Sequence, residues 1–122
     1  MWIFTKDSFL SFAQHPMDDR LVWVYGSIEG DIERGFPGVE VGTNRNSDHR
    51  FCAAVPIDRV AQAMLNCLRD IQYENLQSAV EDLPRWHAYV NVWVTMFEEQ
   101  ERRAADAFSR DRAPRMFDLD AT

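Results

Sequence analysis

The sequence predicts an α+β fold in which helices cover one face of a mostly antiparallel sheet of about five strands. Runs of β-branched and aromatic residues fill most of the first half of the chain, whereas long segments of apolar residues with helical spacing begin after Pro56. The chain has 122 residues, of which 46% are hydrophobic, and a chain of this size forms one core. We therefore expect a single domain over residues 1–110, followed by a flexible tail over 111–122.

The first three strands are predicted from β-forming runs that short polar segments separate. Trp2–Thr5 and Phe9–Gln14 flank the polar segment Lys6–Ser8, a pattern typical of a hairpin. Leu21–Gly26 is a continuous apolar run of β formers. Such a run predicts a strand that is central in the sheet and covered on both sides, or one at an aromatic-rich edge.

A second hairpin is predicted farther along the chain. Val39–Thr43 alternates like a half-exposed strand, and the polar turn Asn44–Asp48 leads to the β-forming run Arg50–Val55. Between the two hairpins, Ser27 can cap a short helix over Ile28–Arg34.

Three helices are predicted after Pro56. Apolar residues recur at three- and four-residue intervals over Asp58–Ile71, which indicates an amphipathic helix. Leu76–Leu83 predicts a second helix, which Pro84 either ends or allows to turn into the next helix. The order strand, helix, strand, strand, helix over Leu21–Ile71 suits half of a ferredoxin-like arrangement.

The last and longest helix carries a stripe of large apolar residues. Its members are Trp86, Tyr89, Val90, Trp93, Met96 and Phe97. Beyond them, Glu98 with Arg102 and Glu99 with Arg103 are acid–base pairs at i,i+4, which predict a solvated continuation of the helix. We expect the stripe to lie in the core, because Trp and Tyr at helical spacing bury large areas. The alternative is a homodimer surface formed by Trp86, Trp93 and Phe97.

The net charge of −7 disfavours direct nucleic-acid binding, because phosphates would be repelled. The same charge favours a protein partner with a basic surface. No basic start precedes a long apolar segment at the amino terminus, and no stretch approaches the ~20 apolar residues that a bilayer needs. We expect a cytoplasmic protein that does not bind membranes.

Residues suited to catalysis or metal binding are sparse. Cys52 and Cys67 are expected to be buried, inert thiols, and no cofactor is predicted. One alternative is a metal site in which His49 and Asp48 act with Cys52. The chain's three histidines lie in separate predicted elements, so a site in which they converge is not expected.

The acidic residues are interpreted mainly as a solvated surface, but two groups are candidates for partner binding. The first surrounds the predicted short helix and consists of Glu29, Asp31, Glu33 and Glu40. The second lies at a turn between two predicted helices and consists of Asp70, Tyr73, Glu74 and Asn75. An Asn cap and a packed Tyr are a structural explanation for the second group. An enzymatic alternative assembles a site from dispersed residues, namely His49, Asp70 and Tyr73.

Two segments of the chain resemble a family of small bacterial and phage proteins. They are Arg69–Leu76, with the sequence RDIQYENL, and Ala88–Trp93, with AYVNVW. Members of that family open with a Trp-hydrophobic-Phe-Thr strand and carry an Ile-Asp-Tyr-x-Asn-Phe-Lys-like element before a Tyr-x-x-Val-Trp helix. The resemblance extends from Met1 to about Gln100, and the chain departs from the pattern at Gln72, Leu76 and Gln77. Because the family has no assigned activity, the resemblance implies a fold and a bacterial or phage origin but no reaction.

We therefore expect a non-enzymatic, acidic protein that binds another protein. A sharper hypothesis is a phage or mobile-element inhibitor of host defence that presents carboxylates in place of nucleic-acid phosphates. The first acids to test for such mimicry are Glu29, Asp31, Glu33 and Glu40.

Overall fold

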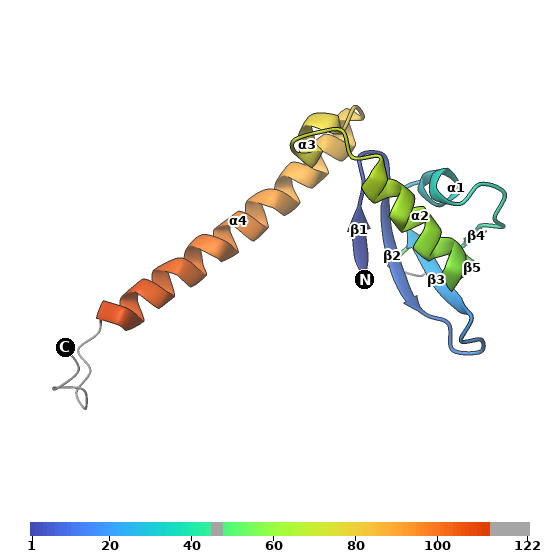
Figure 1. Cartoon of the computed structure of the whole chain (residues 1–122), viewed down its shortest axis with the longest axis horizontal. Coiled ribbons are helices and arrows are strands. Elements are labelled where there is room, and N and C mark those ends of the chain that lie inside the picture. Colours follow the sequence, from blue (N-terminus) through green and yellow to red (C-terminus); the bar gives the residue numbers. More distant parts are fainter. Residues whose placement is uncertain (45–47, 113–122) are drawn as a thin grey trace. The chain divides into compact units, whose positions relative to one another are not determined.

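A computed structural model describes residues 1–44 and 48–112 of the chain (Figure 1). Its α+β architecture agrees with the fold class predicted from the sequence: a five-stranded antiparallel sheet and helices that include a long one at the carboxyl end. The chain divides into two compact units, of which the first is Met1–Asp82 and the second begins at Leu83. The first unit contains the whole sheet, and the second contains the long helix.

The sheet has the strand order β1-β2-β3-β5-β4, and every neighbouring pair is antiparallel. Its strands are β1 (Trp2–Phe4), β2 (Phe9–Gln14), β3 (Leu21–Gly26), β4 (Gly42–Thr43) and β5 (Phe51–Pro56). Both predicted hairpins are confirmed, and β3 is the middle strand, which is the first of the two positions that its apolar run predicted. β4 is shorter than the predicted strand, since the amide of Val39 bonds to the carbonyl of Phe36 instead of joining the sheet. Of the predicted turn after β4, residues 45–47 lie outside the described part.

The described residues form four helices, which are α1 (Asp31–Gly35), α2 (Ile57–Arg69), α3 (Leu76–Ala79) and α4 (Leu83–Arg112). The prediction that Ser27 caps α1 is wrong, because Gly30 is the N-cap and has a φ of +92°, which favours glycine. α3 is a single turn, since Val80 after it is extended. α4 reaches Arg112, so the first two residues of the predicted flexible tail are helical, and those from 113 lie outside the described part.

The segment from β3 to α2 has the split β–α–β arrangement expected for half of a ferredoxin-like fold. The chain leaves β3, forms α1 and returns as β4, while β5 lies between β3 and β4 in the sheet. β3 and β4 are each antiparallel to β5 and therefore run parallel to each other. The remaining part, the β1–β2 hairpin, extends the sheet on the other side of β3.

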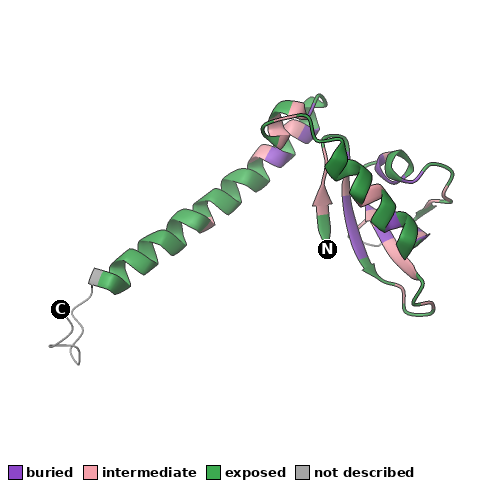
Figure 2. Ribbon diagram, viewed as in Figure 1, coloured by how far each residue is buried: buried purple, intermediate pink, exposed green. Residues whose placement is uncertain are grey.

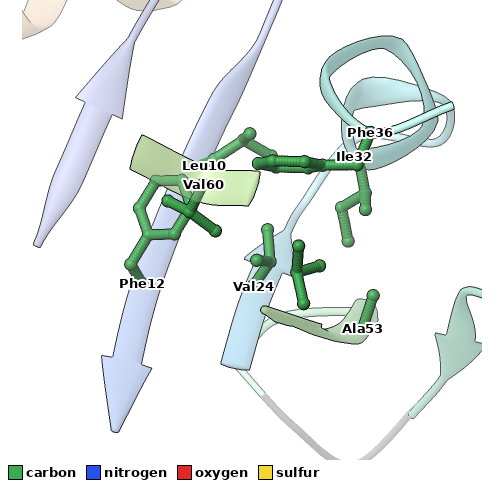
Figure 3. Packing of buried hydrophobic residues seen from close by; sticks show 8 residues of the cluster. Leu10, Phe12, Val24, Ile32, Phe36, Ala53 and Val60 are labelled. Atoms are coloured by element: carbon green, nitrogen blue, oxygen red, sulfur yellow. The ribbon is translucent and has the colours of Figure 1, made fainter. Parts of the chain in front are cut away.

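One face of the sheet forms the hydrophobic core beneath α1 and α2 (Figure 3). The alternation of side chains along each strand places the core residues of the strands on a single face, and residues of the two helices and of the segment after α1 cover them. The core residues are Leu10 and Phe12 of β2, Val24 of β3, Ala53 and Val55 of β5, Ile32 of α1, Phe36 just after α1, and Val60 of α2. Gly26 lets α1 approach β3, since a Cβ atom there would lie 3.2 Å from Cγ1 of Ile32. The prediction that the helices cover one face is confirmed for this unit.

A buried carboxylate fixes α1 to the start of β2. The side chain of Asp31 is fully buried, and its Oδ2 accepts a hydrogen bond from the amide of Phe9 at 2.9 Å. Arg34, which is partly exposed, forms an ion pair with Asp31 from the next turn of the helix. Its Nε also donates to the carbonyl of Asp7 at 3.0 Å. The carboxylate therefore has both a backbone and a side-chain partner.

Replacing this carboxylate is expected to destabilise the sheet unit. Asp31→Ala leaves the amide of Phe9 without its acceptor and the Arg34 guanidinium without its charge partner, so the free energy of unfolding should fall by about 3 kcal/mol. Glu33→Ala, on the exposed side of the same helix, is the control and should change it by less than about 0.5 kcal/mol. Urea unfolding followed by tryptophan fluorescence measures both values. Equal effects of the two substitutions would contradict this role of Asp31.

Candidate functional site

The apolar stripe of α4 is the candidate site, because the half of it that begins at Trp93 is exposed, as is most of this helix (Figure 2). The exposed fractions are 53% for Trp93, 62% for Met96 and 44% for Phe97. The prediction that the stripe lies in the core is therefore wrong for these three residues. Helical spacing identifies the residues that share a side of a helix, but it does not identify what covers that side.

The stripe changes character along the helix. Tyr89 is buried and accepts a hydrogen bond from Arg85 at 3.2 Å, whereas Trp86 and Val90 are half-buried. Trp86 also meets the ring of His87 edge-on. Exposure of the stripe thus begins at Trp93.

The exposed stripe has an apolar floor and a charged rim. The rings of Trp93 and Phe97 stack with centroids 5.2 Å apart and planes 15° from parallel. With Met96 they line a shallow hollow whose edge includes Gln100 and Arg103. Stacking holds the two rings in one orientation, so a partner would meet a surface that is already ordered.

Ion pairs order the helix next to the stripe. Glu99 accepts from Nε of Arg103 at 2.7 Å, which confirms the predicted i,i+4 pair. The other predicted pair is wrong, because Arg102 bonds to Glu99 at i,i+3 and not to Glu98. Hydrogen bonds from Arg102 and then Arg103 lower the pKa of the Glu99 carboxyl, and the bond to Glu99 raises the pKa of Arg102.

The acidic residues near α1 do not all lie on the surface. Glu29, Glu33 and Glu40 are exposed, whereas the carboxylate of Asp31 is inside and holds α1 to β2. The sequence does not show which of these acids is buried, because the burial of a residue in a short helix depends on how that helix packs against the sheet. Only the three exposed acids can contact a partner.

The second acidic group is explained in part by helix capping. The side chain of Asn75 caps α3 by accepting from the amide of Ser78 at 2.9 Å, which confirms the predicted cap. Asp70 is the C-cap residue of α2, and its amide donates a hydrogen bond to the carbonyl of Asn66. Tyr73 is half-buried and Glu74 is exposed.

Two of the residues proposed for an enzymatic site, His49 and Asp70, are associated with opposite faces of the sheet. His49 stacks on Tyr25 at 5.2 Å, and Tyr25 points to the face opposite the core because Val24 points into it. α2, which ends next to Asp70, packs on the core face. In residues 1–44 and 48–112, no three His, Cys, Asp or Glu side chains lie close enough to share a metal ion.

The cysteines differ from their predicted burial. Cys52 is half-buried and Cys67 is exposed, so the prediction of a buried thiol is wrong for Cys67. Partial burial of its sulfur, together with the charges of Asp7 and Asp70, raises the pKa of the Cys67 thiol. A thiol with a raised pKa stays protonated at neutral pH and is a poor nucleophile.

A row of rings on the face opposite the core was not predicted. His15, Trp23, Tyr25 and His49 follow one another with ring centroids 4.9, 6.3 and 5.2 Å apart. Nδ1 of His15 accepts from the amides of Met17 and Asp18, which fixes that ring at the β2–β3 turn. The alternation of Trp23 and Tyr25 along β3 was the available signal, but the histidines come from separate turns.

Comparison with known protein families, curated sequences and solved structures finds no match for this chain. The resemblance to bacterial and phage proteins therefore stays a prediction. No helix within the described residues has both the length and the apolar character needed to cross a membrane.

The Glu99 ion pairs predict a pH-dependent change in α4. Glu99→Gln should speed amide hydrogen exchange over residues 99–108 at neutral pH, because the charged acceptor for Arg102 and Arg103 is lost. The pKa of Glu99 is lowered on folding, so its contribution is present above the ordinary glutamate value of 4.5 and disappears as the pH falls through the lowered value. Below that lowered pKa, Glu99→Gln and the unmodified protein should show the same exchange rates.

Glu98→Gln is the matched control, since Arg102 bonds to Glu99 and not to this neighbour. Hydrogen exchange measured by NMR at several pH values separates the two carboxylates. An effect of Glu98→Gln as large as that of Glu99→Gln would show that general charge, and not these pairs, orders the segment.

Proposed function

We propose that this protein is a non-enzymatic, acidic interaction protein and that the exposed stripe of α4 is its contact surface. The observation that carries the proposal is the exposure of Trp93, Met96 and Phe97 side by side on one side of a long helix. Large apolar side chains that gather at a surface favour association, and Trp is among the residues that contribute most to binding energy.

The surroundings of the stripe support a protein contact. Arg103 and Glu99 stand at its edge and can keep water away from the apolar centre while they pair with polar groups of a partner. The net charge of −7 would draw a partner that carries a basic region near its binding surface. This charge affects mainly the rate of encounter, whereas the apolar centre provides affinity.

The alternative functions have less support than the α4 surface. Nucleic-acid mimicry by the acids near α1 depends on surface carboxylates, and Asp31 is internal. An enzyme built from His49 and Asp70 would need side chains that lie on one side of the sheet. We therefore assign the contact surface to α4. A bacterial or phage origin and a cytoplasmic location remain part of this proposal.

Site-specific photo-crosslinking tests the proposed surface. A benzophenone amino acid at Phe97 should form adducts with protein in cells that express the chain, because the stripe is the side that a partner covers. Thr95, which is exposed and about half a turn away, is the control position and should give much less adduct. Gel shifts and mass spectrometry detect the adducts. Absence of adducts at Phe97, or equal yields at the two positions, would overturn the proposal.

A further inference from the structure

We propose that the stripe of α4 binds the same stripe of a second copy of this chain, with the two helices antiparallel. This inference rests on the proposed contact role of α4 and names the partner. It commits to one alignment, in which the centre of the pair lies between Glu98 and Glu99.

The first support is a heptad spacing along α4. Seven residues follow one another at alternating intervals of four and three, namely Trp86, Val90, Trp93, Phe97, Gln100, Ala104 and Ala107. A helix that keeps this spacing presents a continuous seam to a second helix. α4 is unbroken over the whole span, and its side chains are largely exposed from Asn91 onward. The exposed seam is therefore long enough for a short two-helix contact.

The second support is the size of the seam residues. The exposed seam is bulky at its start, with Trp93 and Phe97, and small toward its end, with Ala104 and Ala107. In the proposed alignment, Trp93 faces Ala104 of the second copy and Phe97 faces Gln100 of the second copy. Large side chains then fill the space beside small ones, as close packing requires. A parallel pair would instead place Trp93 against Trp93 and leave a gap between two Ala104 residues.

The third support is the charge of the flanking residues. In the proposed alignment, Met96 lies beside the aliphatic stem of Arg103 of the second copy, and Val94 lies beside Glu101. Shifting the pair by one heptad toward the carboxyl end would place Arg103 against Arg103 and Glu101 against Glu101, which is unfavourable. A shift in the other direction would need Tyr89 in the contact, and Tyr89 is already buried.

The exposed area is close to what a specific dimer needs. If a large apolar side chain has roughly 200 Å² of surface, the exposed fractions of Trp93, Met96 and Phe97 leave roughly 300 Å² per copy. The stems of Gln100 and Arg103 with Val94 and the alanines add to this, so two copies approach the roughly 1,000 Å² of a specific contact. We therefore expect a dimer that dissociates on dilution into the micromolar range.

Exchanging the large and the small residue tests whether Trp93 of one copy lies opposite Ala104 of the other. The Trp side chain of Ala104→Trp should collide with Trp93 of the second copy. Because the seam has no space for two large side chains at this point, the dissociation constant of the dimer should rise at least 10-fold. Ala104 is exposed, so the variant should fold normally. Ala105→Trp, on the outer side of the helix, is the control and should leave the dimer unchanged.

The double variant Trp93→Ala with Ala104→Trp should recover most of the affinity, because it restores a large residue opposite a small one. Sedimentation equilibrium from micromolar to millimolar concentration measures all four proteins. A monomer throughout that range, or an Ala104→Trp variant that dimerises normally, would overturn the proposal.

Spin-label distances test the direction of the helices. The two native cysteines are first removed by Cys52→Ala and Cys67→Ser, and a spin label is attached at Ser109→Cys. In the antiparallel pair, the labelled positions of the two copies are about 21 helical residues apart along the helix axis, so the two labels should be displaced by ~31 Å in that direction. A label at Glu98→Cys lies at the centre and should report a separation below roughly 20 Å. A parallel dimer would give similar short distances at both positions and would overturn the proposed direction.

The two proposals fail separately. If Phe97 crosslinks only to a different protein and the purified chain stays monomeric, the contact role of α4 stands and the second copy is excluded. If Phe97 gives no adduct in cells while the purified chain dimerises at millimolar concentration, the self-contact stands and the role in cells fails.

Discussion

Burial of one face of the sheet beneath α1 and α2 is the interaction on which the Met1–Asp82 unit depends. β2, β3 and β5 each turn alternate apolar residues toward this face, and Ile32 and Phe36 cover them together with Val60. Antiparallel pairing fixes which residues share the face, because a shift of one residue would turn the core side chains outward. The position of α1 then requires both the absent side chain at Gly26 and the carboxylate of Asp31.

The use of Asp31 in the interior connects fold and function. A carboxylate that accepts a backbone hydrogen bond and pairs with Arg34 is part of the scaffold, and it is not available to a partner. The acidic surface that remains is spread over separate elements, which suits long-range attraction better than recognition of one ligand. Exposed apolar area is concentrated instead on α4, where the proposed contact lies.

The exposed stripe of α4 is ordered, as the proposed contact role requires. Trp93 and Phe97 stack on each other, and ion pairs from Glu99 order the turn beside them. The thiol of Cys67 has a raised pKa, and the histidine of the enzymatic alternative packs against an aromatic ring. The proposed association needs only a surface that fits its partner.

The sequence by itself determined the local elements. The β-forming runs predicted β1, β2, β3 and β5, and apolar spacing predicted α2 and α4, since both signals depend on neighbours along the chain. Asn75 was identified as a cap for the same reason. Only the tertiary structure decided that Asp31 is internal, that Cys67 is exposed and that Trp93 is uncovered. Burial depends on which distant segments pack over a residue, and a pattern along the chain does not record that.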